Sequence, residues 1–273
     1  MAAPNLPSSF IFSQSSLQDF SDCPRRFQLR YIEQLKWPAI ETEPALENER
    51  RQVEGQLFHR MVQQHLIGLP VEKLTRMVNS PDLARWWENY LNHPFHFDGY
   101  SLHTELTLLA PVKSYRLMAK YDLLAVSPDG DAMIYDWKTY HKRPRDEWMA
   151  ARFQTRVYRA LLARAGSHLN GKVPIPPGQI EMIYWYSDFP TELARFPYDE
   201  AQYDRDWETL AGLIEEIAHH GHFQKTEDEK KCAFCPYRSY CNRGEKAGIS
   251  DEMGEEDPGV VELSLEQVAE IEY

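Results

Sequence analysis

The chain is 273 residues long, which suits one elaborated α/β domain with enough residues to bury a hydrophobic core. A net charge of -12 argues against a nucleic-acid partner, but residues 245–273 hold ten acids and one base, and the preceding 244 residues carry only -3. No segment resembles a secretory signal and no apolar run reaches the length of a membrane span, so we expect a cytoplasmic protein with no membrane partner. We therefore divide the chain into one domain over 1–244 and an acidic tail over 245–273.

Apolar residues recur at helical spacing in some segments and alternate in others. Helices are predicted over 8–36, ending before Pro38, over about 46–67, around Trp86 before Pro94, over about 146–165 and over about 203–220. Strands are predicted over 101–109, 115–126, 131–138, 180–187 and 193–198. Strands with helices on both sequence sides favour an α/β fold, in which a mixed central sheet is flanked by helices.

The four residues Ser-Pro-Asp-Gly at 127–130 predict a tight turn between two strands, because proline suits the first turn position and glycine can adopt positive φ. A three-residue loop pairs Ser127 with Asp131 and, counted outward, sets Asp122 across from Asp136. Directly opposed residues have Cβ atoms about 4.5–5.5 Å apart. The two carboxylates would therefore repel each other, and a divalent cation between them would relieve the repulsion.

Alternation along the strand adds a basic group, since Asp136 and Lys138 are two residues apart and point to the same face. Phosphodiester hydrolysis needs such a set, in which carboxylates hold a metal ion and an ammonium group stabilises the charge that develops on the phosphate. Charged residues beside a hairpin also commonly face solvent, and spacing alone does not separate the two interpretations.

The chain resembles the RecB-like branch of the PD-(D/E)xK nuclease superfamily over most of residues 13–243. The matches are a Gly-x3-His, an aspartate on one strand, an Asp-x-Lys on the next and a Gln-x3-Tyr on a helix, formed by Gly55, His59, Asp122, Asp136, Lys138, Gln154 and Tyr158. Tyr121 replaces the proline of the family name and Ala119 stands where glycine is common, but neither change removes a reacting group. The resemblance implies a restriction-endonuclease-like sheet with a helical addition.

The resemblance also implies two overlapping sets of site residues. The catalytic set is Asp122, Asp136, Lys138, Gln154 and Tyr158, and the set that binds Mn²⁺ or Mg²⁺ is His59, Asp122 and Asp136. Periodicity alone leaves His59 at the margin of an apolar helix face, where a packed histidine is the alternative. Gly55, one turn earlier, is expected to leave open space beside it.

Arg152, Arg156 and Arg159 recur at i, i+4 and i+7 on the outer side of the helix predicted over 146–165. Such a stripe suits contacts with the phosphates of DNA. A solvated basic helix face is the alternative.

Three of the four cysteines, Cys232, Cys235 and Cys241, lie within ten residues, and Cys23 stands near the other end of the chain. In a reducing compartment this grouping favours a metal site over disulfides. Zinc and iron–sulfur clusters both accept four thiolates, and the spacing does not distinguish them. The arrangement resembles iron–sulfur nucleases such as the CRISPR-associated RecB-like exonuclease and the AddB nuclease domain, which implies a [4Fe–4S] cluster that joins the two chain ends.

The residues and the resemblance together lead us to expect a metal-dependent DNA nuclease. We expect an exonuclease that acts on single-stranded DNA or DNA ends in repair, recombination or CRISPR adaptation. The alternative is a non-catalytic DNA-binding adaptor of a helicase or integrase complex, with a structural Cys₄ metal site. The sequence contains no Gly-x4-Gly-Lys-Ser/Thr loop, so any unwinding would come from a partner.

Overall fold

The computed structural model describes residues 6–35, 45–233 and 235–244. Its strands form one mixed sheet and are β1 (Ile11–Ser13), β2 (Ser101–Val112), β3 (Tyr115–Val126), β4 (Ala132–Lys138), β5 (Ile180–Tyr186) and β6 (Phe189–Pro197). The order is β1-β3-β4-β5-β6, with β2 paired to β3 outside this path. The predicted strands are therefore present, and the short strand β1 is one that periodicity did not predict.

The long strand β3 organises the sheet. β2 pairs antiparallel with β3 along nearly its whole length, whereas β1 and β4 pair with opposite ends of it. β5 then pairs parallel with β4 and antiparallel with β6. The sheet is therefore mixed, as the sequence predicted.

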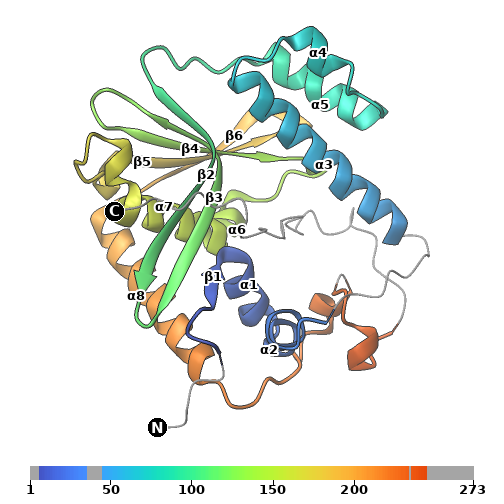
Figure 1. Ribbon diagram of the computed structural model, residues 1–273. Coiled ribbons are helices and arrows are strands. Elements are labelled where there is room, and N and C mark those ends of the chain that lie inside the picture. Colours follow the sequence, from blue (N-terminus) through green and yellow to red (C-terminus); the bar gives the residue numbers. More distant parts are fainter. Residues whose placement is uncertain (1–5, 36–44, 234, 245–273) are drawn as a thin grey trace.

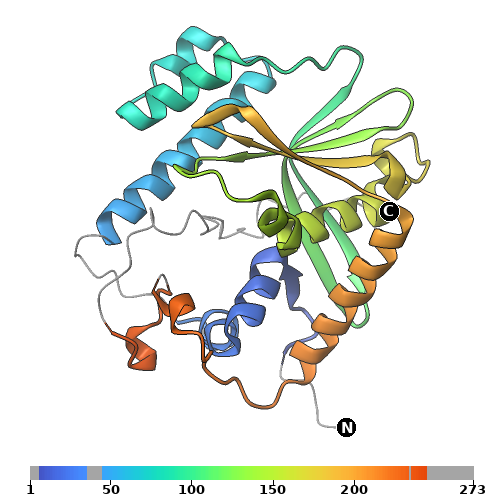
Figure 2. The same ribbon diagram turned by 180° about the vertical axis from the view of Figure 1, so that it is seen from behind.

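Helices cover both faces of the sheet (Figures 1 and 2). They are α1 (Gln14–Asp22), α2 (Pro24–Phe27), α3 (Ala45–Leu66), α4 (Val71–Thr75), α5 (Pro81–Asn92), α6 (Asp146–Ala151), α7 (Phe153–Ala165) and α8 (Glu200–His219). The sheet, α1, α7 and α8 contribute to one hydrophobic core, and the sheet, α3 and α5 to a second. The side chains of β4 alternate between the two cores. Ile134 belongs to the first core, and Tyr135 and Trp137 belong to the second.

Two predicted helices are interrupted. The helix predicted over 8–36 begins only at Gln14, which Ser13 caps, and it breaks at Cys23, whose backbone is extended before Pro24. The helix predicted over 146–165 breaks at Arg152, where ψ is 143° and α6 gives way to α7. The predicted stop at Pro38 and the acidic tail over 245–273 lie outside the described residues.

None of the described helices is long and apolar enough to cross a membrane.

Helix α3 approaches the end of β4 closely at Gly55. A Cβ at this position would lie 3.0 Å from Thr139 Oγ1, so the expectation of open space beside Gly55 is wrong. The missing side chain lets the helix pack against the strand that carries Lys138. His59, one turn later, is thereby brought to the same end of the sheet.

Gly55→Ala tests this contact, because a methyl group would press on Thr139 while the alanine gains up to about 1 kcal/mol of helix propensity. We expect Gly55→Ala to be more favourable in a Thr139→Ala background than in wild type, by at least about 0.5 kcal/mol. The measurement is the free energy of unfolding in urea for the four members of the cycle. Equal effects in both backgrounds would show that this helix and strand do not touch here.

Candidate active site

The predicted hairpin register is confirmed. Leu123 lies opposite Tyr135 and Val126 opposite Ala132, and the Ser127 amide donates to the Asp131 carbonyl at 2.8 Å. Gly130 has a φ of +91°, as the turn requires. Counted one step beyond the paired residues, Asp122 and Asp136 stand across from each other.

Asp122 lies at an irregularity of the sheet. The pairing of β2 with β3 continues on both sides of this position, but Glu105, which would face Asp122, has a φ of +54° and is skipped. The alternation of β3 changes there, because the first core contains Leu117, Ala119 and Tyr121 before it and Leu124 and Val126 after it. A positive φ at a residue other than glycine costs about 1–3 kcal/mol. A residue with a strained backbone, Glu105, therefore stands opposite Asp122.

Asp136, Lys138 and Gln154 form a closed buried triangle. Lys138 Nζ lies 2.9 Å from Asp136 Oδ1 and donates to Gln154 Oε1 at 2.9 Å, and Gln154 Nε2 donates to Asp136 Oδ2 at 2.6 Å. Asp136 is 3% and Lys138 5% exposed. The structure thus brings together three of the predicted catalytic residues from β4 and α7.

His59 from α3 pairs with the second carboxylate. Its Nδ1 lies 3.2 Å from Asp122 Oδ2, which also accepts from the Trp137 amide at 2.9 Å. Burial alone would raise the pKa of Asp122, but His59, the Trp137 amide and the Lys138 charge outweigh it and lower this pKa. Burial likewise opposes the charge on His59, but Asp122 raises the pKa of His59 above its ordinary value. The two groups therefore favour the imidazolium–carboxylate pair.

The pKa of Asp136 is shifted in the opposite direction from that of Asp122. Burial raises the pKa of its carboxyl to about 7 against the attraction of the Lys138 ammonium, and the negative charge of Asp122 adds to the rise. Two carboxyls at one site with pKa values shifted in opposite directions are typical of catalytic centres.

The residues present fit a divalent cation, although no three His, Cys, Asp or Glu side chains within the described ranges are already grouped around one point. Asp136 Oδ1 is buried and accepts no well-directed hydrogen bond, even though the Lys138 ammonium lies beside it. A bound cation would compensate this oxygen and favour the ionised form of Asp136. His59, Asp122 and Asp136 are the side chains that would hold it.

A tyrosine that we did not predict from the sequence, Tyr184, lies beside the triangle. Lys138 Nζ lies 5.4 Å from the centre of the Tyr184 ring, and the Tyr184 hydroxyl lies 2.8 Å from Thr155 Oγ1. The ring of the predicted site residue Tyr158 lies 4.9 Å from the tilted ring of Tyr121, whose hydroxyl donates to the Tyr158 carbonyl. Tyr158 therefore packs beside the strand that carries Asp122, and its catalytic role stays a prediction. Alternation along β5, which places Tyr184 on the face of Asp136, was the available signal for Tyr184.

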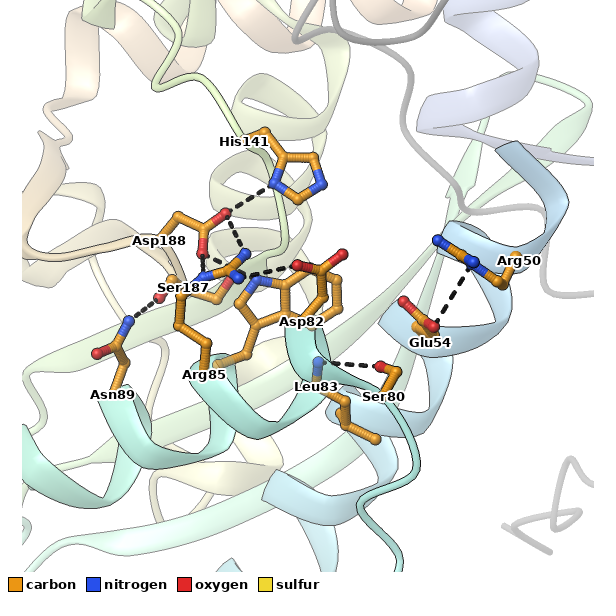
Figure 3. A network of polar contacts seen from close by, with 11 residues as sticks. Arg50, Glu54, Ser80, Asp82, Leu83, Arg85, Asn89, His141, Ser187 and Asp188 are labelled. Atoms are coloured by element: carbon orange, nitrogen blue, oxygen red, sulfur yellow. Dashed lines mark hydrogen bonds and ion pairs between the residues drawn. The ribbon is translucent and has the colours of Figure 1, made fainter. Parts of the chain in front are cut away.

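A second polar network, which the sequence did not predict, includes His141 from the segment after Lys138 (Figure 3). Asp188, in the turn between β5 and β6, lies between Arg85 and His141, 2.8 Å from Arg85 Nε and 2.9 Å from His141 Nδ1. It also accepts from the Trp86 indole at 3.0 Å. The hydrogen bond to Asp188 raises the pKa of His141.

The same turn contacts the backbone at the active site. The Ser187 amide donates to the Lys138 carbonyl at 2.8 Å, and the Ser187 carbonyl accepts from Asn89 on α5 at 2.7 Å. Helix α5 and the β5–β6 turn therefore hold the end of β4 in place. Because these contacts join residues that are far apart in the sequence, spacing gave no signal for them.

The three arginines do not form the exposed stripe that spacing predicted. Arg159 is 6% exposed, donates to the Pro197 carbonyl at 2.9 Å and lies over the Tyr198 ring at 4.3 Å, so its predicted place on an exposed stripe is wrong. Arg152 stands at the break before α7, over the Trp148 ring. Phosphate contacts by Arg152, Arg156 and Arg159 stay a prediction.

All four cysteines line one small cavity, beside Lys225, Arg26, Arg238 and Arg243. None of them forms a disulfide. Cys23 Sγ accepts from the Thr226 amide at 3.4 Å, and the Arg25 amide donates to the Gln224 carbonyl at 3.0 Å. The two ends of the described chain are thus side by side, α2 against the segment after α8 (Figures 1 and 2).

The raised pKa of Asp136 predicts a pH dependence of stability in the metal-free protein. Between the ordinary value of 3.8 and about 7 the folded state keeps a proton that the unfolded chain has lost, so stability falls as pH rises through this window. We expect Asp136→Asn to remove roughly 2 to 4 kcal/mol of this decline. Urea unfolding from pH 4 to 8 measures it.

Asp131→Asn, an exposed change on the same hairpin, is the matched control and should keep the wild-type slope. Identical slopes for wild type and Asp136→Asn would contradict the buried, proton-retaining carboxyl.

Comparison with known proteins identifies the family of this chain. A sequence profile of the PD-(D/E)XK nuclease superfamily matches residues 11–242. No curated protein sequence matches the chain. The solved structure of SSO0001 has 15% sequence identity over 85% of each chain, with a TM-score of 0.45. A candidate exonuclease from Eubacterium rectale has 8% identity over 89% of this chain and 92% of its own, with a TM-score of 0.48.

Both TM-scores are below 0.5, and the family is assigned from the sequence profile. The matched segment contains the hairpin, the buried triangle and His59, and it spans most of the chain. The chain therefore belongs to the PD-(D/E)XK nuclease superfamily.

Proposed function

We propose that this nuclease is a metal-dependent deoxyribonuclease that degrades DNA from ends, with a preference for single strands. The observation that carries the proposal is the intact buried set in which Asp136, Lys138 and Gln154 meet beside the His59–Asp122 pair. A non-catalytic adaptor has no need to keep a desolvated ammonium group in such a position. The preference for single strands and for ends rests on the resemblance to the RecB-like branch alone.

The chain's own groups define the chemistry. Lys138 is fixed by Asp136 and Gln154, so its ammonium can stabilise the charge that develops on a phosphate without first reorganising. A divalent cation held by His59, Asp122 and Asp136 would supply a Lewis acid and an activated water. His59 and Asp136 each hold a proton more readily than usual, so cation binding by these groups releases protons and tightens as pH rises.

Replacement of the site residues tests the proposal. Asp122→Ala and Asp136→Ala should abolish cleavage, because each leaves the cation without one of its two carboxylates. Lys138→Ala should lower turnover about 10²–10³-fold while metal and DNA binding persist, because the ammonium acts on the transition state. The assay follows labelled single-stranded, double-stranded and circular DNA with Mn²⁺ or Mg²⁺.

Asp131→Ala on the same hairpin and the exposed Lys113→Ala are matched controls that should retain the wild-type rate. Equal rates for wild type and Lys138→Ala would disprove this active site. Degradation of circular DNA as fast as linear DNA would disprove the requirement for ends.

The four cysteines support a further part of the proposal, a [4Fe–4S] cluster that joins α2 to the C-terminal segment. Support comes from the shared cavity, from the Thr226 amide that donates to Cys23 Sγ, and from the cationic side chains that line the cavity and would offset thiolate charge. Burial raises the pKa of Cys235 to about 11, so its thiolate needs a positively charged partner. A structural zinc ion is the alternative with the same ligands.

Metal analysis of anaerobically purified protein distinguishes the two. We expect about four iron atoms per chain and a brown colour if the cluster is a cubane. Cys23→Ala should lose the iron and expose α2 to proteolysis, whereas Ser21→Ala, an exposed change on α1, should not. One zinc and no iron in wild type would reject the cluster but leave the nuclease assignment standing.

The predicted helicase or integrase partner and the role in repair, recombination or CRISPR adaptation have no support among the described residues. They stay predictions of the resemblance alone.

A further inference from the structure

A cavity of about 560 Å³ lies on the side of α7 that faces away from the catalytic triangle. It is bounded by α6, α7, the end of β6 and α8. Gln154 and Arg156 are two residues apart on α7, which turns their side chains to nearly opposite sides of the helix. Gln154 contacts Asp136 and Lys138, whereas Arg156 contacts Asp206 on α8. The cavity is therefore separate from the active site.

The lining carries an excess of positive charge. Three guanidinium groups line the cavity, from Arg156, Arg159 and Arg205, against two carboxylates, Asp206 and Glu208. Asp206 is shared, because it lies 3.3 Å from Arg156 Nε and 3.8 Å from Arg159 and accepts from the Tyr198 hydroxyl at 3.1 Å. One buried carboxylate thus compensates two arginines incompletely.

Donors remain available beside this shared carboxylate. Within the part of the chain that the structure describes, neither the side chain of the exposed Arg205 nor the Nη atoms of Arg156 have a hydrogen-bond or ion-pair partner. Arg159, by contrast, is held by the Thr155 and Pro197 carbonyls and forms a fixed wall. Guanidinium groups that converge on one space suit an oxyanion, which they can bind in a bidentate manner.

The remaining wall is apolar on one side, and Gln202 and Thr209 complete the lining. Phe196, Pro197 and Ala150 form the apolar side, and Phe196 is held edge-on against Tyr184 at 5.8 Å. A volume of this size is within the range of small-molecule sites, about 300–1,000 Å³. A charged end and an apolar wall in one cavity of this size match a ring joined to a phosphate rather than an extended strand.

We propose that this cavity binds a nucleoside monophosphate, with Arg156 and Arg205 on the phosphate and the Phe196–Pro197 wall against the base. The recognition of a phosphate monoester rests on the cavity, whereas the choice of a nucleotide rests on the proposed nuclease function, whose products are nucleotides. A nucleotide bound in this cavity would therefore be a reaction product held away from the site of cleavage.

Calorimetric titration of the full-length chain with thymidine 5′-monophosphate, without divalent metal, tests the proposal. Wild type should bind one equivalent, and thymidine, which lacks the phosphate, should bind at least about tenfold more weakly. Arg156→Gln with Arg205→Gln should weaken binding by at least about tenfold, since both guanidinium groups are lost. Arg205→Gln alone, at an exposed residue, should weaken it by about threefold and guards against a folding defect of the double variant.

Arg76→Gln with Arg116→Gln removes two exposed charges elsewhere and should leave the affinity unchanged. Equal binding of thymidine and its monophosphate, equal affinity of wild type and the double variant, or no binding to wild type would each overturn the cavity assignment. A nuclease assay on the same wild-type sample separates the two proposals. Cleavage without nucleotide binding rejects the cavity alone, and binding without cleavage rejects the nuclease mechanism alone.

Discussion

The burial of the Lys138 ammonium group between Asp136 and Gln154 is the constraint on which the rest of the site depends. A desolvated ammonium costs several kcal/mol unless close partners compensate it. Asp136 comes from the same strand, two residues earlier, but Gln154 must be delivered by α7. The hydrogen bond that compensates Lys138 therefore depends on the position of α7 on the sheet. It depends equally on the break at Arg152, which sets where α7 begins.

The partner of the second carboxylate, Asp122, comes from a helix on the opposite face of the sheet. Asp122 stands where the alternation of β3 changes, and it meets His59 from α3, which packs on the second hydrophobic core. The site at one end of β4 thus depends on elements that pack in both cores. Packing changes in the first core act on Lys138 and Gln154, whereas changes around Gly55 and α3 act on His59 and Asp122.

Local chemistry made part of this arrangement predictable from sequence. The turn residues at 127–130 fix the hairpin register, and strand alternation puts Asp136 and Lys138 on one face, since both rules involve neighbours in the chain. Helical spacing failed for Arg159 because it ignores the break at Arg152 and the carboxylate of Asp206 on α8. The contact between Gly55 and Thr139 was likewise hidden, because it joins a helix and a strand that are far apart in sequence.

The protein donors around the two carboxylates also determine how a cation can bind. His59 compensates Asp122, and Lys138 lies against Asp136, so each carboxylate already has a positive partner when no metal is present. If His59 and the two carboxylates hold a cation, as we propose, that cation would compete with the proton of His59 and would offset the charge of Asp136. Gln154 would keep the Lys138 ammonium in place while a cation offsets the charge of Asp136, so cation binding and the placement of Lys138 would involve the same short contacts.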